Sequence, residues 1–174
     1  NKVVVSKRLS LDMTTDMGSM SGAMSRGHMM SDGSMMDSNA NAADPETAGI
    51  EWSDMGIAAT GVQWKITDQE TNTSNENVKW TFNKDDVVRI TLKNDSNSMH
   101  PMQHPIHLHG QRFAVVGKNG KTTTDAEWKD TITVPSGQIY ELLAVMDNPG
   151  EWMLHCHIAE HLETGMATVF EVKE

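Results

Sequence analysis

Cysteine is almost absent from this sequence of 174 residues, which contains one, Cys156. A single cysteine excludes an intramolecular disulfide and leaves its thiol available as a metal ligand. Basic residues are also scarce, because 14 lysines and arginines stand against 24 aspartates and glutamates, a formal net charge of -10. This balance argues against nucleic-acid binding, which needs a basic surface. It suits cationic partners, metal ions included, although a solvated acidic surface is the simpler interpretation.

Long apolar runs are missing as well. No stretch approaches the roughly 18 apolar residues that a membrane-spanning helix requires. The first residues, NKVVVSKRLS, are typical of a strand and lack the basic start and apolar middle of a signal peptide. The chain begins without methionine, so we expect a processed product or a part of a larger protein. Its length and its hydrophobic content of 37% fit one globular domain with a core.

Branched aliphatic residues are nearly missing from residues 10–49, where Leu11 is the single example. Eight of the 14 methionines lie in this segment, between Met13 and Met36. Such a composition cannot fill a core, and we predict a mobile, in part helical insertion. The insertion would separate a first strand in residues 1–9 from the remainder of a single domain in residues 50–174.

Short runs rich in β-branched and aromatic residues recur through the rest of the chain. Turn signals such as KNGK, VPSGQ and DNPG separate several of them, a spacing typical of a β-sandwich or barrel. Outside the methionine-rich segment, only residues 158–163 favour a helix. The predicted class is all-β, with strands in residues 2–11, 62–67, 78–82, 87–93, 106–110, 112–116, 131–135, 139–145, 151–155 and 166–172.

Six of the eight histidines lie in two short motifs, HPIHLHG and HCHIAEHLETGM. Side chains of a strand alternate between its two faces. His155 and His157 therefore share one face, and Cys156 points to the other. The same parity separates His104 from the next two histidines of its motif. Two ligand sets result: His104, Cys156, His161 and Met166 form one, and His107, His109, His155 and His157 form the other.

The donor atoms of the two sets favour copper. Two imidazoles, one thiolate and a weak axial thioether are the ligands of a blue-copper electron-transfer site. The second set offers nitrogen alone, which favours copper over calcium, magnesium or manganese and leaves zinc as the main competitor. The simpler alternative is a group of hydrogen-bonded polar residues in a β-core. A single histidine would fit that alternative, but it does not account for two motifs in matching register.

The two motifs together resemble the copper-binding pair in the last cupredoxin domain of the multicopper oxidases. RLSLDM, the methionine-rich insertion after it and WKDT at residues 128–131 are similar to the third domain of bacterial cuprous oxidases. The resemblance implies a cupredoxin-like Greek-key β-sandwich and a periplasmic, secreted or cell-surface location. It also implies a type 1 copper on His104, Cys156, His161 and Met166, a type 2 ligand at His107, and type 3 ligands at His109, His155 and His157.

The family's trinuclear copper cluster takes twice as many histidines as this second set supplies. No further His-x-His pair is present, so we expect an N-terminal cupredoxin domain, in the same protein or another subunit, to supply the rest. The resemblance implies one-electron oxidation of Cu(I), phenols or aromatic amines. Cys156, His155 and His157 would pass the electrons to the cluster, where O2 is reduced to water. Alone, the chain would be inactive as an O2 reductase. Pairing of two copies is a weaker alternative, because the family's halves come from different domains.

The methionines allow more than one interpretation. Met13, Met17, Met20 and Met24 would form one stripe on a helix. That stripe fits a packing helix, a thioether surface that collects Cu(I), or a linker without a metal role. By resemblance to the cuprous oxidases, the possible Cu(I) ligands are Met13, Met17, Met20, Met24, His28, Met29, Met30, Met35, Met36 and Met102. Two other functions stay open: a stand-alone blue-copper electron carrier and a Cu(I)-binding module.

Overall fold

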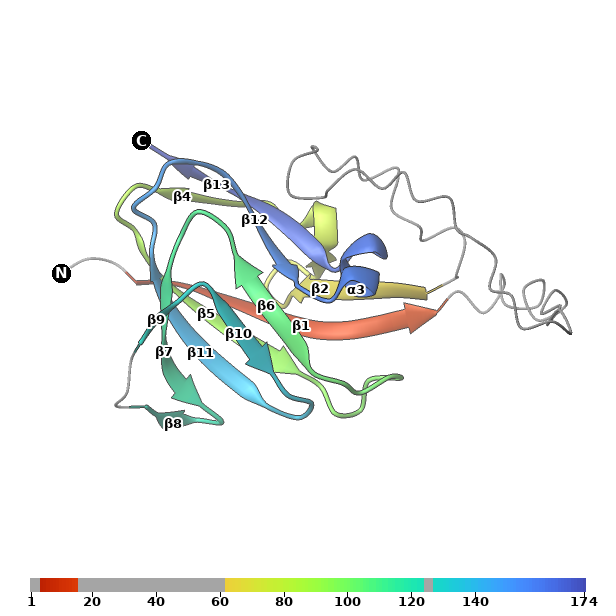
Figure 1. Ribbon diagram of the computed structural model, residues 1–174. Coiled ribbons are helices and arrows are strands. Elements are labelled where there is room, and N and C mark those ends of the chain that lie inside the picture. The colour runs from red at the N-terminus through yellow and green to blue at the C-terminus, as the bar shows by residue number, and fades with distance from the viewer. Residues whose placement is uncertain (1–3, 16–61, 124–126) are drawn as a thin grey trace, which may run out of the picture.

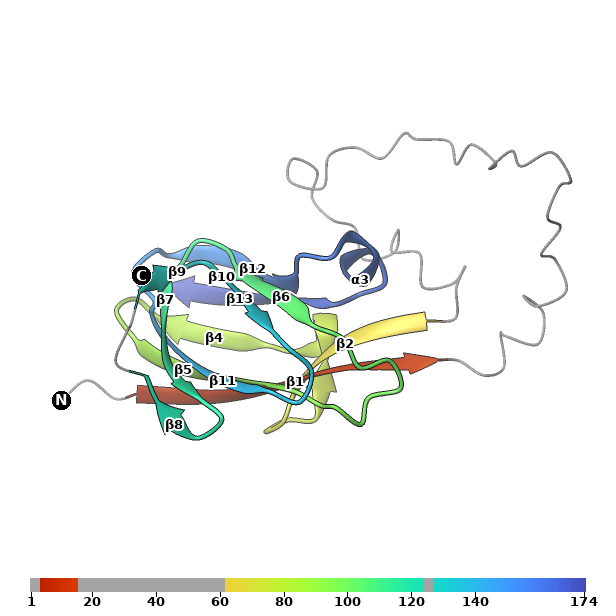
Figure 2. The same ribbon diagram turned by 60° about the horizontal axis from the view of Figure 1, so that its bottom comes forward.

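The computed structural model describes residues 4–15, 62–123 and 127–174. They form two β-sheets packed face to face, with one short α-helix at one end (Figure 1 and Figure 2). The all-β, cupredoxin-like prediction is confirmed. Within the described ranges, no helix is long and apolar enough to cross a membrane.

The larger sheet has eight strands. β1 lies near its centre, antiparallel to one neighbour and parallel to the other. Across the sheet the order is β3 (Thr73–Ser74), β2 (Val62–Asp68), β1 (Val4–Thr15), β5 (Val87–Asn94), β11 (Ile139–Val145), β7 (Phe113–Lys118) and β8 (Lys121–Thr122), with β9 (Trp128–Lys129) also paired to β7. In β5, the buried Val88, Ile90 and Leu92 alternate with more exposed residues, because successive side chains point to opposite faces.

The smaller sheet has five strands, and its strands carry four of the candidate ligands, His104, His107, His155 and Cys156. Its order is β10 (Thr131–Val134), β6 (His104–Leu108), β12 (Gly150–Cys156), β13 (Ala167–Lys173) and β4 (Trp80–Asn83). The 3-10 turn η2 (Asn75–Asn77) precedes β4, and helix α3 (Ala159–Glu163) connects β12 to β13. The strands β6 and β12 are antiparallel neighbours, so the two histidine motifs lie side by side.

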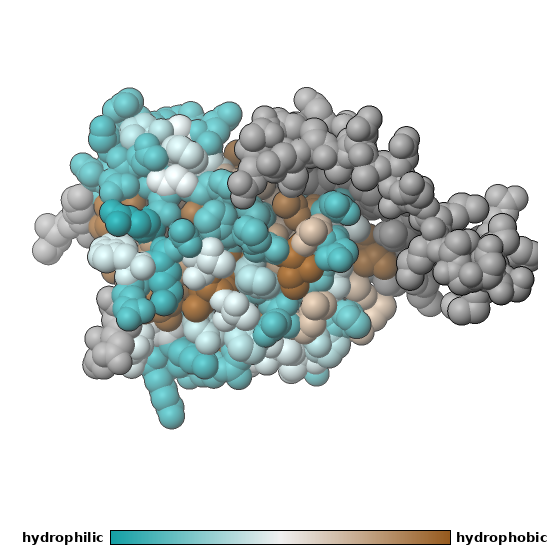
Figure 3. Space-filling model, viewed as in Figure 1, coloured by the Kyte–Doolittle hydropathy of each residue, from teal (hydrophilic) through white to brown (hydrophobic). Residues whose placement is uncertain are grey.

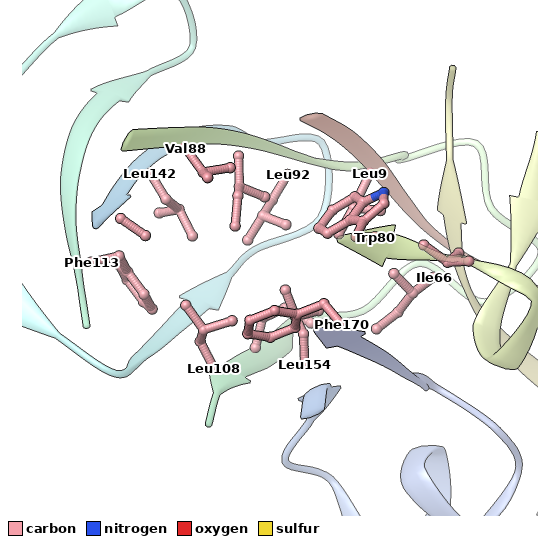
Figure 4. Packing of buried hydrophobic residues seen from close by; sticks show 14 of the residues in the cluster. Leu9, Ile66, Trp80, Val88, Leu92, Leu108, Phe113, Leu142, Leu154 and Phe170 are labelled. Carbon is pink, nitrogen blue, oxygen red and sulfur yellow. The ribbon is translucent and has the colours of Figure 1, made fainter. Parts of the chain in front are cut away.

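Leucine, isoleucine, valine and aromatic side chains fill the space between the sheets. Figure 4 shows Leu92 and Leu142 of the larger sheet facing Leu108, Leu154 and Phe170 of the smaller one. Each such side chain, once removed from water, contributes about 1.5–3 kcal/mol. On the face drawn in Figure 3, hydrophilic side chains predominate and hydrophobic ones occupy narrower areas. The core thus fixes how the two sheets, and the motifs on them, pack together.

The first strand is longer than predicted. β1 continues through Thr15, so residues 10–15 belong to the sheet and not to an insertion that begins at residue 10. Residues 9–15 pair with β2, and Leu11 is fully buried. The burial of this leucine and the pairing with β2 keep residues 10–15 in the sheet, although their composition suggested that they could not pack. Met13 therefore lies on a strand, and a helical stripe that starts there is wrong. Residues 16–49 of the predicted insertion lie outside the described residues.

Other strand bounds agree with the sequence within two residues, and residues 139–145 agree at both ends. The predicted helix in residues 158–163 is α3, one residue shorter. The strands β3, β8 and β9 were not predicted. Each has two residues, which is too short for a repeating pattern to show in a sequence.

Candidate metal centre

Strand β12 shows the alternation that the sequence predicts. In its pairing with β6, His155 lies opposite His107 and Cys156 lies opposite Ile106. Residues directly opposite each other in an antiparallel pair point to the same face. Cys156 therefore points with Ile106 into the core between the sheets, where both are buried. His155 points with His107 to the outer face of the smaller sheet.

Three donor atoms converge at one end of the core, at an inner site that we define as His104, Cys156 and His161. The Nδ1 atoms of His104 and His161 lie 3.2 Å apart. The Cys156 Sγ lies 3.8 Å from Nδ1 of His104 and 3.5 Å from Nδ1 of His161. All three residues are nearly fully buried. They come from β6, β12 and α3, so the tertiary fold builds the site.

Main-chain hydrogen bonds close the loop that follows Cys156. Its N–H donates to the carbonyl of Met166 over 3.0 Å, and the N–H of Met166 donates to the carbonyl of His161 over 2.8 Å. Gly165 has a φ of 102°, a conformation that residues with a side chain rarely adopt. The turn thus holds the main chain of Met166 next to Cys156, and the Met166 side chain is fully buried in the core.

Burial sets the protonation of the inner site. It lowers the pKa of His104 to about 4, with repulsion from His161 adding to the effect, and it lowers the pKa of His161 to about 4 as well. Burial also raises the pKa of the Cys156 thiol to about 11. At pH 7 the metal-free site therefore holds two neutral imidazoles and a protonated thiol. The imidazoles can accept a metal ion at once, whereas the thiol must first lose its proton.

The spacing of the inner site fits a bound transition-metal ion. Nitrogen and sulfur ligands lie about 2.0–2.3 Å from such an ion, which places ligands of one ion roughly 3.3–3.8 Å from each other. The three observed separations run from 3.2 to 3.8 Å. Two imidazoles and one thiolate are the trigonal ligands of a blue-copper site. The inner site therefore fits a type 1 copper ion in both geometry and donor chemistry.

The outer cluster, defined as His107, His109, His155 and His157, gathers four imidazoles on the opposite side of β12. Ligand nitrogens of the first three lie within 4.8 Å of one another, and Nε2 of His109 lies 2.9 Å from Nε2 of His155. His157 is exposed, with its ring centroid 5.6 Å from that of His155 and 5.8 Å from that of His107. The imidazoles of His107, His109 and His155 thus lie close together, and that of His157 lies at the edge of the group.

Hydrogen bonds orient two imidazoles of the outer cluster. Nδ1 of His107 donates to the carbonyl of Asp130 over 3.1 Å and lies 2.8 Å from the hydroxyl of Thr131. Nδ1 of His155 donates to the carbonyl of Cys156 over 2.8 Å. Metal-binding histidines commonly fix their second nitrogen in this way. In both rings this leaves Nε2 as the atom that would bind a metal ion, and in His155 that atom lies 2.9 Å from Nε2 of His109. Burial, opposed by that carbonyl bond, lowers the pKa of His155 to about 4, which keeps it neutral.

A close approach of the main chain positions His109. Its N–H donates to the carbonyl of Met153 over 2.9 Å. The next residue, Gly110, has a φ of 67° and lies so close to the Trp152 indole that an added Cβ would stand 2.1 Å from the ring. Trp152 in turn donates from Nε1 to the carbonyl of Asn148 over 2.9 Å. Glycine is therefore required after His109 by both the backbone conformation and the space.

Comparison with known proteins agrees with this geometry. A family model described as multicopper oxidase matches residues 21–174. The chain belongs to the multicopper oxidase family. Membership implies copper as the cofactor, which the donor set of the inner site fits.

Among curated multicopper oxidases, Laccase-3 of Arabidopsis thaliana is 40% identical over 49% of this chain and 17% of its own length. Laccase-2 of Trametes versicolor is 45% identical over 38% of this chain and 14% of its own length. The chain thus spans less than a fifth of these laccases. A solved structure, a multicopper oxidase from Campylobacter jejuni described as a metallo-oxidase, covers 100% of this chain with a TM-score of 0.59, 22% identity and 31% of its own chain. At that identity the likeness shows the shared fold.

The structure adds two groups that the ligand prediction for this member of the multicopper oxidase family did not include. Thr131, next to Asp130 in the WKDT segment, orients His107 through the contact of its hydroxyl with Nδ1. Trp64 stacks on the ring of His161 with ring centroids 3.8 Å apart. No local pattern could have indicated this contact, because 97 positions separate the two residues.

The predicted Cu(I) ligands are described in part. Met13 and Met102 are half-buried and pack against the core, and the Asn94 side chain donates to the carbonyl of Met102 over 2.7 Å. Met17, Met20, Met24, His28, Met29, Met30, Met35 and Met36 lie outside the described residues.

Proposed function

We propose that this chain is the type 1 copper-bearing C-terminal domain of a multicopper oxidase. One observation carries the proposal: Cys156 faces the inner site, and the imidazole of the adjacent His155 belongs to the outer cluster. A single extended segment therefore borders two different groups of metal ligands. An electron carrier with one copper ion needs the first group alone, whereas an oxidase needs both.

The ligand roles follow the two groups of residues. His104, Cys156, His161 and Met166 hold the type 1 copper, His107 is a type 2 ligand, and His109, His155 and His157 are type 3 ligands. When bound, copper supplies one-electron redox chemistry that couples oxidation of a reductant to the four-electron reduction of O2 to water.

Cys156 connects the two groups. Peptide bonds join it directly to His155 and His157, so two covalent paths lead from the thiol to the outer cluster. A third path is shorter, because Nδ1 of His155 donates to the Cys156 carbonyl over 2.8 Å. The full burial of Cys156 keeps this connection away from water. Cys156, His155 and His157 are thus the residues we assign to electron transfer between the centres.

The outer cluster is half of a trinuclear site. We assign the other half to an N-terminal cupredoxin domain, in the same protein or in another subunit, that docks on the outer face of the smaller sheet. Alone, the chain reduces no O2. By the same family resemblance, we place the complete protein in the periplasm, at the cell surface or outside the cell.

Two kinds of reductant suit the inner site. The family resemblance implies phenols or aromatic amines as one kind and Cu(I) as the other; the relatives are named as laccases and, in Campylobacter jejuni, as a metallo-oxidase. Soft thioethers favour Cu(I), and Met102 lies two residues before His104, on a segment that the Asn94 amide holds. Met13, Met17, Met20, Met24, His28, Met29, Met30, Met35, Met36 and Met102 are the candidate ligands of substrate copper.

A stand-alone blue-copper carrier is the alternative function. It needs the inner site and assigns no role to the outer cluster, in which hydrogen bonds orient both His107 and His155. A Cu(I)-binding module leaves the convergence of Cys156 and His161 unexplained. Both alternatives fit fewer observations than an oxidase domain does.

Copper titration of the full chain tests the proposal. We expect one blue copper per chain by visible absorption and EPR, and no O2 consumption. His100→Ala serves as a matched control, because His100 belongs to neither ligand group, and it should keep the blue copper. Colourless binding of several Cu(I) ions without a blue site would instead show a storage module. O2 turnover with four or more coppers per two chains would show that two copies complete the cluster.

A further inference from the structure

An indole ring covers part of the inner site. Trp64 of β2 stacks on His161 with ring centroids 3.8 Å apart and an interplanar angle of 22°. Trp64 also makes T-shaped contacts with two other rings. Its ring centroid lies 5.2 Å from that of His104 at an interplanar angle of 67°, and 6.0 Å from that of His100 at 70°. Trp64 is 6% exposed, while His104 and His161 are 1% and 3% exposed. A single side chain thus contacts both imidazoles of the inner site.

The backbone of β2 holds Trp64 in place from both edges. On one edge it pairs with Met13 of β1. On the other, the buried Asn75 side chain donates from Nδ2 to the carbonyl of Trp64 over 3.1 Å and accepts at Oδ1 from the N–H of Ile66 over 2.9 Å. These bonds fix the strand at the position where the indole meets His161. The indole is therefore a rigid wall and not a mobile surface group.

Main-chain hydrogen bonds hold the backbone of His161 but do not fix the rotation of its ring. This residue lies on α3, which has five residues and no side-chain cap at its N-terminus, and Figure 1 and Figure 2 both show this helix at the end of the sandwich beside β2. The terminal rotation of a histidine ring is broad unless packing restricts it. A stacked aromatic ring restricts that rotation and excludes water from one imidazole face.

We propose that Trp64 is a positioning residue that fixes the plane of the His161 ring, keeps water from the type 1 copper and so sets its reduction potential. The inference rests on the proposed function, because it requires copper at the inner site. Its physical basis is that a hydrophobic shell around a metal site controls solvent access and local dielectric, and through them the reduction potential. Water stabilises the more highly charged oxidised ion, so an opened site has a lower potential.

The test compares Trp64→Phe, which keeps a smaller flat ring, with Trp64→Leu, which keeps an apolar side chain without one. Trp128→Leu is the matched control, because Trp128 is 61% exposed and lies on β9, at the other end of the sandwich from α3 in both ribbon views. In the copper-free chain, the NMR signals of the His161 ring protons should show the upfield shift that a stacked indole causes. Trp64→Leu should remove this shift.

The copper-loaded chain provides the deciding measurements. We expect Trp64→Leu to change the blue absorption and the copper hyperfine splitting, to admit azide to the copper, and to shift the reduction equilibrium at least tenfold toward the oxidised protein, about 59 mV for one electron. Trp64→Phe should shift it less in the same direction, and Trp128→Leu should not shift it.

The outcomes separate this inference from the proposed function. A blue wild-type chain whose Trp64→Leu variant keeps the same spectrum, potential and exclusion of azide overturns the role of Trp64 and leaves the proposed function intact. An equal shift in Trp128→Leu also overturns it. A wild-type chain without blue copper overturns both. If circular dichroism shows that Trp64→Leu does not fold, Trp64→Met replaces it, because methionine fills the gap flexibly without a flat ring.

Discussion

The inner site and the outer cluster lie on opposite sides of the same strand, yet their surroundings differ. The inner site combines sulfur with nitrogen, is almost fully buried and takes all its close donors from the described residues. The outer cluster offers imidazoles alone, and His157 among them is exposed. In the described part of the chain, the buried inner site therefore has no exposed side on which another domain could add a ligand, whereas the outer cluster is open to a second domain. Under the proposed function, one chain would complete the type 1 copper site and supply only half of the ligands of the oxygen-reducing site.

The largest expected effect comes from removing the thiol. Cys156→Ser eliminates the thiolate of the inner site, so the blue absorption should disappear completely while copper still binds to the outer cluster. His109→Ala should do the opposite, keeping the blue absorption and weakening copper binding at the outer cluster. Visible spectra and copper content per chain measure both. The prediction that the two sites bind copper independently is wrong if His109→Ala loses the blue absorption or Cys156→Ser keeps it.

The next effect concerns the support of the outer cluster. Gly110→Ala places a Cβ 2.1 Å from the Trp152 ring at a φ of 67°, so overpacking and the left-handed backbone together should destabilise the fold by about 3 kcal/mol. Gly120→Ala is the matched control, with a φ of 74° and nothing within 4 Å of the added atom; it should cost about 1 kcal/mol. Denaturant unfolding measures both. Equal losses would mean that the contact with Trp152 contributes nothing.

A smaller effect should follow from loosening one imidazole. Thr131→Val removes the hydroxyl that lies 2.8 Å from Nδ1 of His107. Losing such a supporting hydrogen bond typically lowers metal affinity about 10–100-fold, and we expect this at the outer cluster while the blue absorption stays the same. Thr133→Val, at an exposed position of the same strand, is the control. Copper titration in the Cys156→Ser background isolates the outer cluster. A change in the blue site of Thr131→Val would show that the two sites are coupled.

The smallest expected effect is on the number of protons that the inner site releases when copper binds. Burial raises the pKa of Cys156 to about 11 and lowers the pKa of His104 and His161 to about 4. Around pH 7, binding of Cu(II) at the inner site should therefore release about one proton, from the thiol. Near pH 4 the release should rise, because the imidazoles are then partly protonated and must lose protons too. Calorimetry in buffers of different ionisation enthalpy measures the release. A value near zero at pH 7 would show that the thiol is already ionised.

Much of the fold could be predicted from the sequence because short strands and turns leave local patterns. Residues 139–145 and α3 are examples, since alternation or helical composition and a flanking turn signal mark them. The end of β1 could not be predicted, because the burial of Leu11 depends on neighbours from β2 and β5. Likewise, the two-residue strands β3, β8 and β9 exist only through the strands with which they pair.

The candidate site divides in the same way. By itself, the sequence determined that Cys156 and its two flanking histidines project to opposite sides of an extended segment, because alternation is a local property of backbone geometry. Only the tertiary structure decided that the His104 and His161 nitrogens lie within 3.8 Å of the sulfur, that Thr131 holds His107, and that Trp64 covers His161. Those contacts depend on strand register and sheet packing, which burial of the whole core selects and which no short stretch of sequence contains.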